Sequence, residues 1–175
     1  MRVIAGTAKG VPLKAPNVSG IRPTSDLIRG AIFDILGQFF DADTRVLDLY
    51  AGTGALGIEA LSRGAGWADF VEQNARVCGV IRENLKAAGL QHQAIVHCLP
   101  VERASPIGPY DLIFMDPPYA LEPNPSLALP LLRDGGRLVL EHSRRAPPPQ
   151  AGLIKQRRHG DTVISIYEPQ KALVG

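Results

Sequence analysis

The segment Asp116-Pro117-Pro118-Tyr119 has residue types suited to chemistry and follows an apolar run at residues 110–115. The run is typical of a buried strand, and open α/β sheets bind their ligands at the carboxyl ends of strands. The two prolines lack a backbone N–H and fix φ, so they end the strand rigidly and leave backbone carbonyls as acceptors. A carboxylate, fixed carbonyls and an aromatic ring suit a planar base with an exocyclic amine.

Asp-Pro-Pro-Tyr on its own is more often a strand end followed by a turn with a surface tyrosine. The upstream sequence is therefore needed to distinguish a binding site from an ordinary turn. Residues 45–50 form another strand-like run, followed by Ala51-Gly52-Thr53-Gly54-Ala55-Leu56-Gly57 and a helical pattern. Gly52 and Gly54 permit a tight turn and the close approach of a ligand, and Gly57 lets the helix pack close to the strand. The spacing also fits the dinucleotide fingerprint G-x-G-x-x-G, which is a weak signal.

Two acids distinguish this turn from that of a dehydrogenase. Asp48 lies four residues before Gly52, where a carboxylate meets an ammonium group but repels a pyrophosphate. Glu72 ends a strand-like run at 68–72, about 20 residues beyond the glycines, where a ribose diol is expected. A strand-end glutamate is otherwise an ordinary solvated residue, and its distance from the turn favours the ribose role.

In these motifs the chain resembles the class I S-adenosylmethionine-dependent methyltransferases, and more narrowly the RsmD family of 16S rRNA guanine-N2 methyltransferases. The resemblance covers nearly the whole chain. Its most discriminating parts are terminal, because many amino-methylating enzymes share the two central motifs. They are residues 1–6, Lys9-Gly10, Arg22-Pro23-Thr24 with Asp26 and Arg29, Gly160-Asp161-Thr162 and residues 166–168.

The resemblance implies that S-adenosylmethionine lies over the glycine turn, with Asp48 near its amino-acid portion and Glu72 on its ribose. Leu99 stands where the family has a polar residue beside the adenine, and we expect it to pack on the adenine face. The predicted cofactor-binding residues are Asp48, Ala51, Gly52, Gly54, Gly57, Glu72, Gln73 and Leu99.

The implied substrate is a guanine flipped from 16S rRNA, conventionally numbered 966, in the assembling small ribosomal subunit. Asp116 and the Pro117 carbonyl orient the N2 amine for attack on the methyl group, and Tyr119 holds the ring. The predicted catalytic residues are Asp116, Pro117, Pro118 and Tyr119.

Charge is segregated along the chain, although its net value is only +2. Residues 1–30 and 133–175 each carry +4, so the middle carries −6. If the fold brings both termini beside the active site, they form one phosphate-binding surface. An ordinary solvated surface remains the alternative for the carboxy-terminal cations. The predicted RNA contacts are Arg2, Lys9, Lys14, Arg22, Thr24 and Arg29.

Composition and pattern indicate one α/β domain of 175 residues, 45% of them hydrophobic. We expect residues 1–24 to form a basic RNA-contacting extension, and 25–175 a Rossmann-like core with a mostly parallel seven-stranded sheet, helices on both faces and an antiparallel carboxy-terminal hairpin. The expected helices span 25–36, 74–88 and 127–133, and the hairpin turns at 159–161. Without an apolar leader or a Cys/His ligand set, we expect a cytoplasmic, monomeric protein with no metal and two reduced cysteines.

Three other functions remain open at this point. An adenine-N6 methyltransferase uses a similar Pro-Pro-aromatic motif, although Asp116 in place of Asn and the Arg22-Pro23-Thr24 segment favour guanine in RNA. The second alternative is a noncatalytic RNA-binding module that retains the glycine turn only as scaffold. The presence of all three acids, Asp48, Glu72 and Asp116, argues against this alternative. A nicotinamide dehydrogenase is third.

Overall fold

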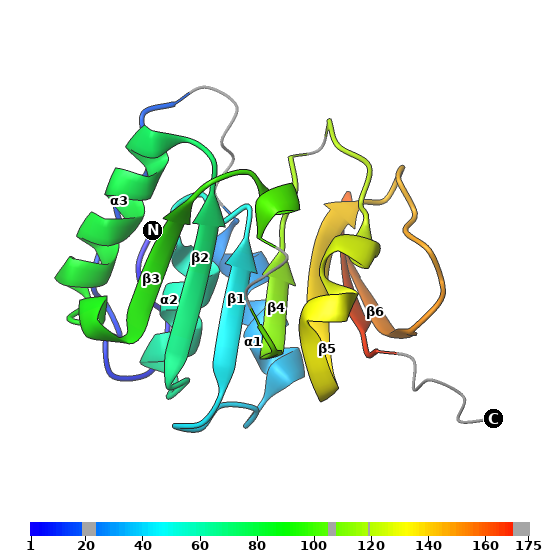
Figure 1. Ribbon diagram of the computed structural model, residues 1–175, viewed down its shortest axis with the longest axis horizontal. Coiled ribbons are helices and arrows are strands. Elements are labelled where there is room, and N and C mark those ends of the chain that lie inside the picture. Colours follow the sequence, from blue (N-terminus) through cyan, green and yellow to red (C-terminus); the bar gives the residue numbers. More distant parts are fainter. Residues whose placement is uncertain (19–23, 105–107, 119, 170–175) are drawn as a thin grey trace.

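The protein is a seven-stranded sheet in the order β3-β2-β1-β4-β5-β7-β6 (Figure 1). The computed structural model describes residues 1–18, 24–104, 108–118 and 120–169. Strands β1 to β5 are parallel, and β7 and β6 complete the sheet in antiparallel pairings, as expected for this fold class. The strands are β1 Arg45–Leu49, β2 Trp67–Glu72, β3 Ala94–Cys98, β4 Tyr110–Met115, β5 Leu132–Ser143, β6 Leu153–His159 and β7 Thr162–Tyr167.

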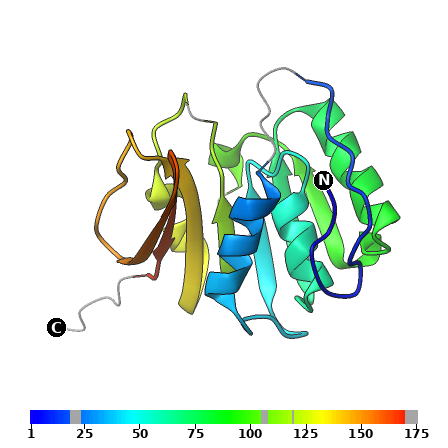
Figure 2. The same ribbon diagram turned by 180° about the vertical axis from the view of Figure 1, so that it is seen from behind.

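Three α-helices cover one face of the sheet (Figure 2). They are α1 Asp26–Leu36, α2 Ala55–Ser62 and α3 Ala75–Ala87. Ser25 caps α1 by accepting a hydrogen bond from the Ile28 N–H, and Asn74 caps α3 in the same way. Their apolar side chains share one core with the sheet, which includes Phe33, Phe70 and Phe114.

The opposite face is covered by short 3-10 helices in the described part of the chain. These are η2 Val101–Arg103, η3 Pro125–Leu127 and η4 Leu129–Leu131, and η1 Gln91–Gln93 precedes β3. Residues of η2, η3 and η4 pack on a second core that contains Leu47, Tyr110 and Leu138. The helix expected at 127–133 is therefore wrong: Pro130 lacks the N–H that an α-helix needs, and β5 already begins at Leu132.

The amino-terminal segment, residues 1–18, lies over α2 and α3 (Figure 2). Val3, Ala8 and Leu13 are buried in the core beneath it. This stretch is therefore integral to the helical face. No described helix combines the length and apolar character that a membrane span requires.

Candidate active site

A cavity of about 490 Å³ opens at the carboxyl ends of the parallel strands. It lies where the strand order reverses between β1 and β4, which is the usual ligand position in open α/β sheets. The described lining residues are Val18, Thr24, Ser25, Ile28, Asp48, Tyr50, Ala51, Gly52, Thr53, Ala55, Leu56, Val71, Glu72, Gln73, Asn74, Val101, Glu102, Asp116, Pro117, Pro118, Leu121, Glu141 and Thr162.

The turn after β1 brings the backbone close to the cavity. Ala51 and Gly52 line it, whereas Gly54 and Gly57 lie behind them and shape the turn. Gly54 has φ +76° at the start of α2, and a Cβ on Gly57 would come within 2.4 Å of the Phe70 ring. The predicted role of Gly57 in close helix–strand packing is confirmed, and Gly54 and Gly57 act through geometry rather than by lining the cavity.

Main-chain N–H groups hold the two acids beside this turn. Glu72 accepts hydrogen bonds from Gly52 N at 3.2 Å and from Asn74 N at 2.8 Å. Asp48 accepts one from Gly57 N at 3.0 Å and is 2% exposed. Burial raises the pKa of Asp48 well above its usual range, and the charges of Asp116 and Glu72 add to the effect, while the Gly57 N–H opposes it.

The other end of the cavity is formed by side chains from separate segments. Asp116 follows β4, and the Thr24 hydroxyl just before α1 donates to its Oδ2 at 2.8 Å. Pro117 is buried and Pro118 is exposed, and both line the cavity. Tyr119 lies outside the described residues, so its predicted place on the base stays a prediction.

Sequence reasoning missed two polar residues at this end, Glu141 in β5 and Thr162 at the start of β7. They are 6% and 8% exposed and both line the cavity. The signal for Glu141 was present, because Leu138-Val139-Leu140-Glu141 is an apolar run ending in an acid. The runs that end at Glu72 and Asp116 have the same pattern.

The described lining contains five carboxylates, Asp48, Glu72, Glu102, Asp116 and Glu141, and no lysine, arginine or histidine. Such a surface repels a pyrophosphate and attracts a cationic ligand. The cavity therefore fits a cofactor with ammonium and sulfonium charges, and it argues against the dehydrogenase alternative. Among the described residues no group of three or more His, Cys, Asp or Glu side chains could hold a metal, and Cys78 and Cys98 are free thiols.

Comparison with known proteins agrees with this geometry. A family model described as "Conserved hypothetical protein 95" matches residues 1–168. "Putative rRNA methyltransferase YlbH" of Bacillus subtilis (strain 168) is 36% identical over 182 residues, covering 96% of this chain and 98% of that protein. "Ribosomal RNA small subunit methyltransferase D" of Escherichia coli (strain K12) is 34% identical over 120 residues, covering 68% of this chain and 60% of that protein.

The chain belongs to the RsmD family of S-adenosylmethionine-dependent methyltransferases. The solved structure described as "Putative methyltransferase yhhF from Escherichia coli" has a TM-score of 0.81 at 28% identity and covers 97% of both chains. The predicted family and fold class are confirmed.

One predicted cofactor contact of this RsmD-family chain, Leu99, stands next to the cavity without lining it, and its N–H donates to Glu72 O at 3.1 Å. Leu99 is partly buried against the core on the 3-10 side, and it is not among the residues that line the cavity. Val101 and Glu102 of η2 line the cavity two and three residues further on. In this family member, η2 is therefore the segment after β3 that faces the cavity.

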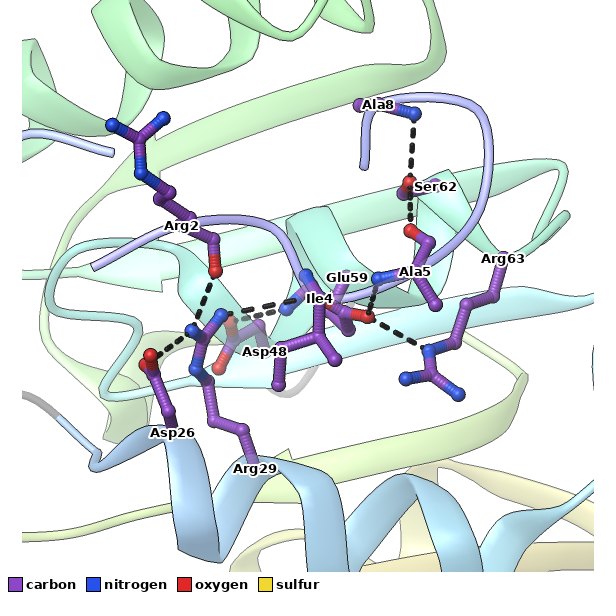
Figure 3. A network of polar contacts seen from close by, with 11 residues as sticks. Arg2, Ile4, Ala5, Ala8, Asp26, Arg29, Asp48, Glu59, Ser62 and Arg63 are labelled. Atoms are coloured by element: carbon purple, nitrogen blue, oxygen red, sulfur yellow. Dashed lines mark hydrogen bonds and ion pairs between the residues drawn. The ribbon is translucent and has the colours of Figure 1, made fainter. Parts of the chain in front are cut away.

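Arg29 was predicted to contact RNA, and the structure shows that prediction to be wrong. Its side chain is fully buried. It donates to Arg2 O and to Asp26 Oδ1, both at 2.7 Å (Figure 3). Its NH1 lies 3.8 Å from the buried carboxylate of Glu59. The sequence motif identified Arg29 as a family position, but it did not show that its side chain would be buried beside Asp26 and Glu59.

The other predicted RNA contacts are spread over the molecule. Arg2 donates to Gly10 O, and Lys14 pairs with Glu83 on α3 at 2.7 Å. Lys9 is exposed on the loop that hydrogen-bonds the far end of α2 at Ser62, away from the cavity. Arg22 lies outside the described residues, and Thr24 is at the cavity.

The described parts of the two basic termini do not form a single surface. The amino-terminal segment covers α2 and α3, near β3 and β2, whereas β6 is the opposite edge strand (Figures 1 and 2). The condition for one continuous phosphate-binding surface, that both basic termini lie beside the active site, is therefore not met by residues 1–18 and β6.

Proposed function

We propose that this protein transfers a methyl group from S-adenosylmethionine to the exocyclic N2 of a guanine in 16S rRNA of the small ribosomal subunit. The main support for this proposal is the arrangement of two acids in a single cavity. At one end, Glu72 accepts hydrogen bonds from main-chain N–H groups, and at the other end, Asp116 accepts a hydrogen bond from Thr24. A nucleoside cofactor and an amine-bearing base are thereby brought together.

The residues at the first end suit the cofactor. Glu72 provides acceptors for a ribose diol, and Asp48 provides a negative charge for an ammonium group. Gly52 permits close approach of a ligand to the backbone, and Val71 and Val101 add apolar lining suited to a purine ring. When bound, S-adenosylmethionine supplies a methyl group whose bond electrons stay on sulfur, so the attacking nitrogen gives up one proton.

The residues at the second end act on the amine. An exocyclic amine is a poor nucleophile because its lone pair is delocalised into the ring. Asp116 and the Pro117 carbonyl accept N–H bonds, which pyramidalises the nitrogen and stabilises the positive charge that develops on it. The hydrogen bond from Thr24 holds the carboxylate in one orientation, so positioning contributes to the rate as well.

The rRNA substrate is supported by the names of the two relatives, an rRNA methyltransferase and a small-subunit rRNA methyltransferase. Guanine rather than adenine is favoured by Asp116 together with the Arg22-Pro23-Thr24 segment, which the family resemblance associates with guanine in rRNA. Thr24 links the Arg22-Pro23-Thr24 segment directly to that carboxylate.

The test is to incubate the purified protein with labelled S-adenosylmethionine and small subunits from a strain that lacks the corresponding methylation. The rRNA is then digested and its nucleosides are identified by mass spectrometry. N2-methylguanosine at one 16S site is the expected product. N6-methyladenosine would assign the protein to the adenine-modifying group instead, and tight subunit binding without transfer would support a binding module.

A further inference from the structure

Glu141 places a second carboxylate beside Asp116 at the base end of the cavity. Strands β4 and β5 pair in parallel with Met115 opposite Leu140, so Asp116 and Glu141 occupy the next positions of neighbouring strands. Side chains two residues apart in a strand point to the same face of the sheet. Phe114 and Val139, two residues before Asp116 and Glu141, both belong to the core under the α-helices. Asp116 and Glu141 therefore belong to the face over which α1 packs.

The surroundings of Glu141 make it part of a built site rather than of the solvated surface. It is only 6% exposed, yet it lines the cavity together with Thr162 and with Ser25 at the start of α1. Its backbone is fixed in the middle of the sheet, because β5 pairs with β4 on one side and with β7 on the other. A carboxylate held in this way presents acceptors in a defined place.

The bases that carry an exocyclic amine differ in what stands next to it. Guanine has N1–H beside the N2 amine, which gives two adjacent donors, and a carboxylate accepts both in a bidentate pair. Adenine has an N1 lone pair beside its N6 amine, and 2-aminopurine has an N1 lone pair beside its N2 amine. A carboxylate repels that lone pair, whereas an amide both accepts from the amine and donates to N1.

We propose that Glu141 selects guanine by accepting N1–H and one N2–H, while Asp116 and the Pro117 carbonyl accept the other N2–H. This inference rests on the proposed function and adds the residue that reads the base. Glu141 is a specificity residue, and the carboxylate pair explains how an amine-methylating site on this fold rejects adenine.

The decisive experiment uses small subunits reconstituted with either guanine or 2-aminopurine at the target position. Both bases carry the reactive amine at the same place, and they differ at N1 and O6. The quantity measured is the ratio of kcat/KM for guanine to kcat/KM for 2-aminopurine. We expect this ratio to be about 100 or more for the unaltered protein, because a site built to accept a hydrogen bond strongly rejects an analogue that lacks the donor.

Glu141→Gln should lower kcat/KM for guanine by about 10- to 100-fold and raise it for 2-aminopurine, so that the ratio collapses. Glu141→Asp keeps two acceptors and should retain the preference for guanine at a lower rate. Glu102→Gln removes a carboxylate from the η2 side of the same cavity and should leave the ratio unchanged. The melting temperature and the Kd for S-adenosylmethionine of each variant show whether the fold and the cofactor end are intact.

The outcomes separate this inference from the proposed function. If the unaltered protein forms no N2-methylguanosine, the proposed function fails. If it does form this product and folded, cofactor-binding Glu141→Gln keeps the original ratio, Glu141 does not read N1 and the inference is overturned. An equal loss of ratio in Glu102→Gln would likewise overturn it, because net charge rather than a specific contact would then set the preference.

Discussion

The two ends of the cavity are built in different ways. At the end proposed to bind the cofactor, Asp48 and Glu72 accept hydrogen bonds from three main-chain N–H groups, those of Gly52 in the turn after β1, Gly57 in α2 and Asn74 after β2. At the base end, Thr24, Asp116 and Glu141 come from three segments far apart in sequence. The first arrangement is local and depends on the backbone path, while the second depends on how α1 and the strands pack. Single substitutions should therefore affect the two ends separately.

The amino-terminal segment connects the elements that carry these ends (Figure 3). Glu59 on α2 is fully buried and accepts hydrogen bonds from Ile4 N and Ala5 N at 2.8 and 2.9 Å, and from Arg63 Nε at 2.8 Å. Arg29 on α1 lies beside the same carboxylate. Because α2 begins at the glycine turn and α1 begins beside Thr24, this cluster fixes both ends relative to each other.

The largest effect is expected from Glu59→Gln. The substitution removes the buried member of the two carboxylates beside Arg29, since Asp26 is largely exposed. Breaking a buried pair at one partner costs about 3–5 kcal/mol of the free energy of unfolding. Urea denaturation followed by circular dichroism measures this loss. Both cofactor affinity and methyl transfer should decline together as the protein unfolds.

Glu83→Gln is the matched control for this prediction. It makes the same chemical change in an ion pair whose side chains, on Lys14 and Glu83, are 72% and 58% exposed. The cost should be below about 1 kcal/mol, because water and salt screen such a pair. Equal destabilisation by both substitutions would show that the cluster around Glu59 does not join the two ends.

Asp116→Ala should break only the base end. The variant loses the acceptor that stabilises charge on the amine, so kcat should drop by about 10²- to 10³-fold. The Kd for S-adenosylmethionine, measured by isothermal titration calorimetry, and binding to the small subunit should stay close to their original values. A large loss of cofactor affinity would mean that the two ends are not separable.

Glu72→Gln should weaken cofactor binding and leave kcat nearly unchanged, and its effect should be smaller than that of Asp116→Ala. The amide keeps one acceptor oxygen, so the hydrogen bond from either Gly52 N or Asn74 N is lost together with the negative charge that we propose to lie beside the ribose. A charge-assisted hydrogen bond of this kind corresponds to an increase in the Kd for the cofactor of about 10- to 100-fold. Methyl transfer at saturating cofactor should remain nearly unchanged, and a loss of kcat equal to that of Asp116→Ala would contradict this assignment.

The difference between the two ends also explains what the sequence could predict. The turn, Asp48 and Glu72 follow one another at short, regular spacings, so local pattern was sufficient to predict the fold class and several residues that line this end of the cavity. Even there, Val101 and Glu102 rather than Leu99 line the cavity, because the path of the chain after β3 depends on packing against the second core.

At the base end, Glu141 and Thr162 meet Asp116 only through the strand order β4-β5-β7, which local spacing does not contain. Arg29 shows the same limit. Its position after Arg22-Pro23-Thr24 resembled that of an RNA contact, but burial against Glu59 is decided by tertiary packing. The sequence around a charged residue does not show whether its side chain will be buried or exposed in the folded protein.

The smallest expected effect concerns Asp48 in the cofactor-free protein. Because its pKa in the folded state is raised above the ordinary value of 3.8, the folded protein binds this proton more tightly than the unfolded chain does. Its contribution to stability is therefore full below about pH 4 and is lost as the pH rises through the raised pKa. Asp48→Asn cannot ionise, so without cofactor it should be more stable than the original protein by a few degrees in Tm at neutral pH, with the difference shrinking toward pH 4.

The Tm of both proteins is measured by differential scanning calorimetry across this pH range, with and without S-adenosylmethionine. With cofactor the order should reverse, because the neutral amide of the Asp48→Asn variant offers no charge to the ammonium group and the ligand then stabilises the original protein more. A Tm difference that does not vary with pH would show that ionisation of Asp48 costs no stability. The hydrogen bond from Gly57 N would then be sufficient to stabilise the charge of Asp48.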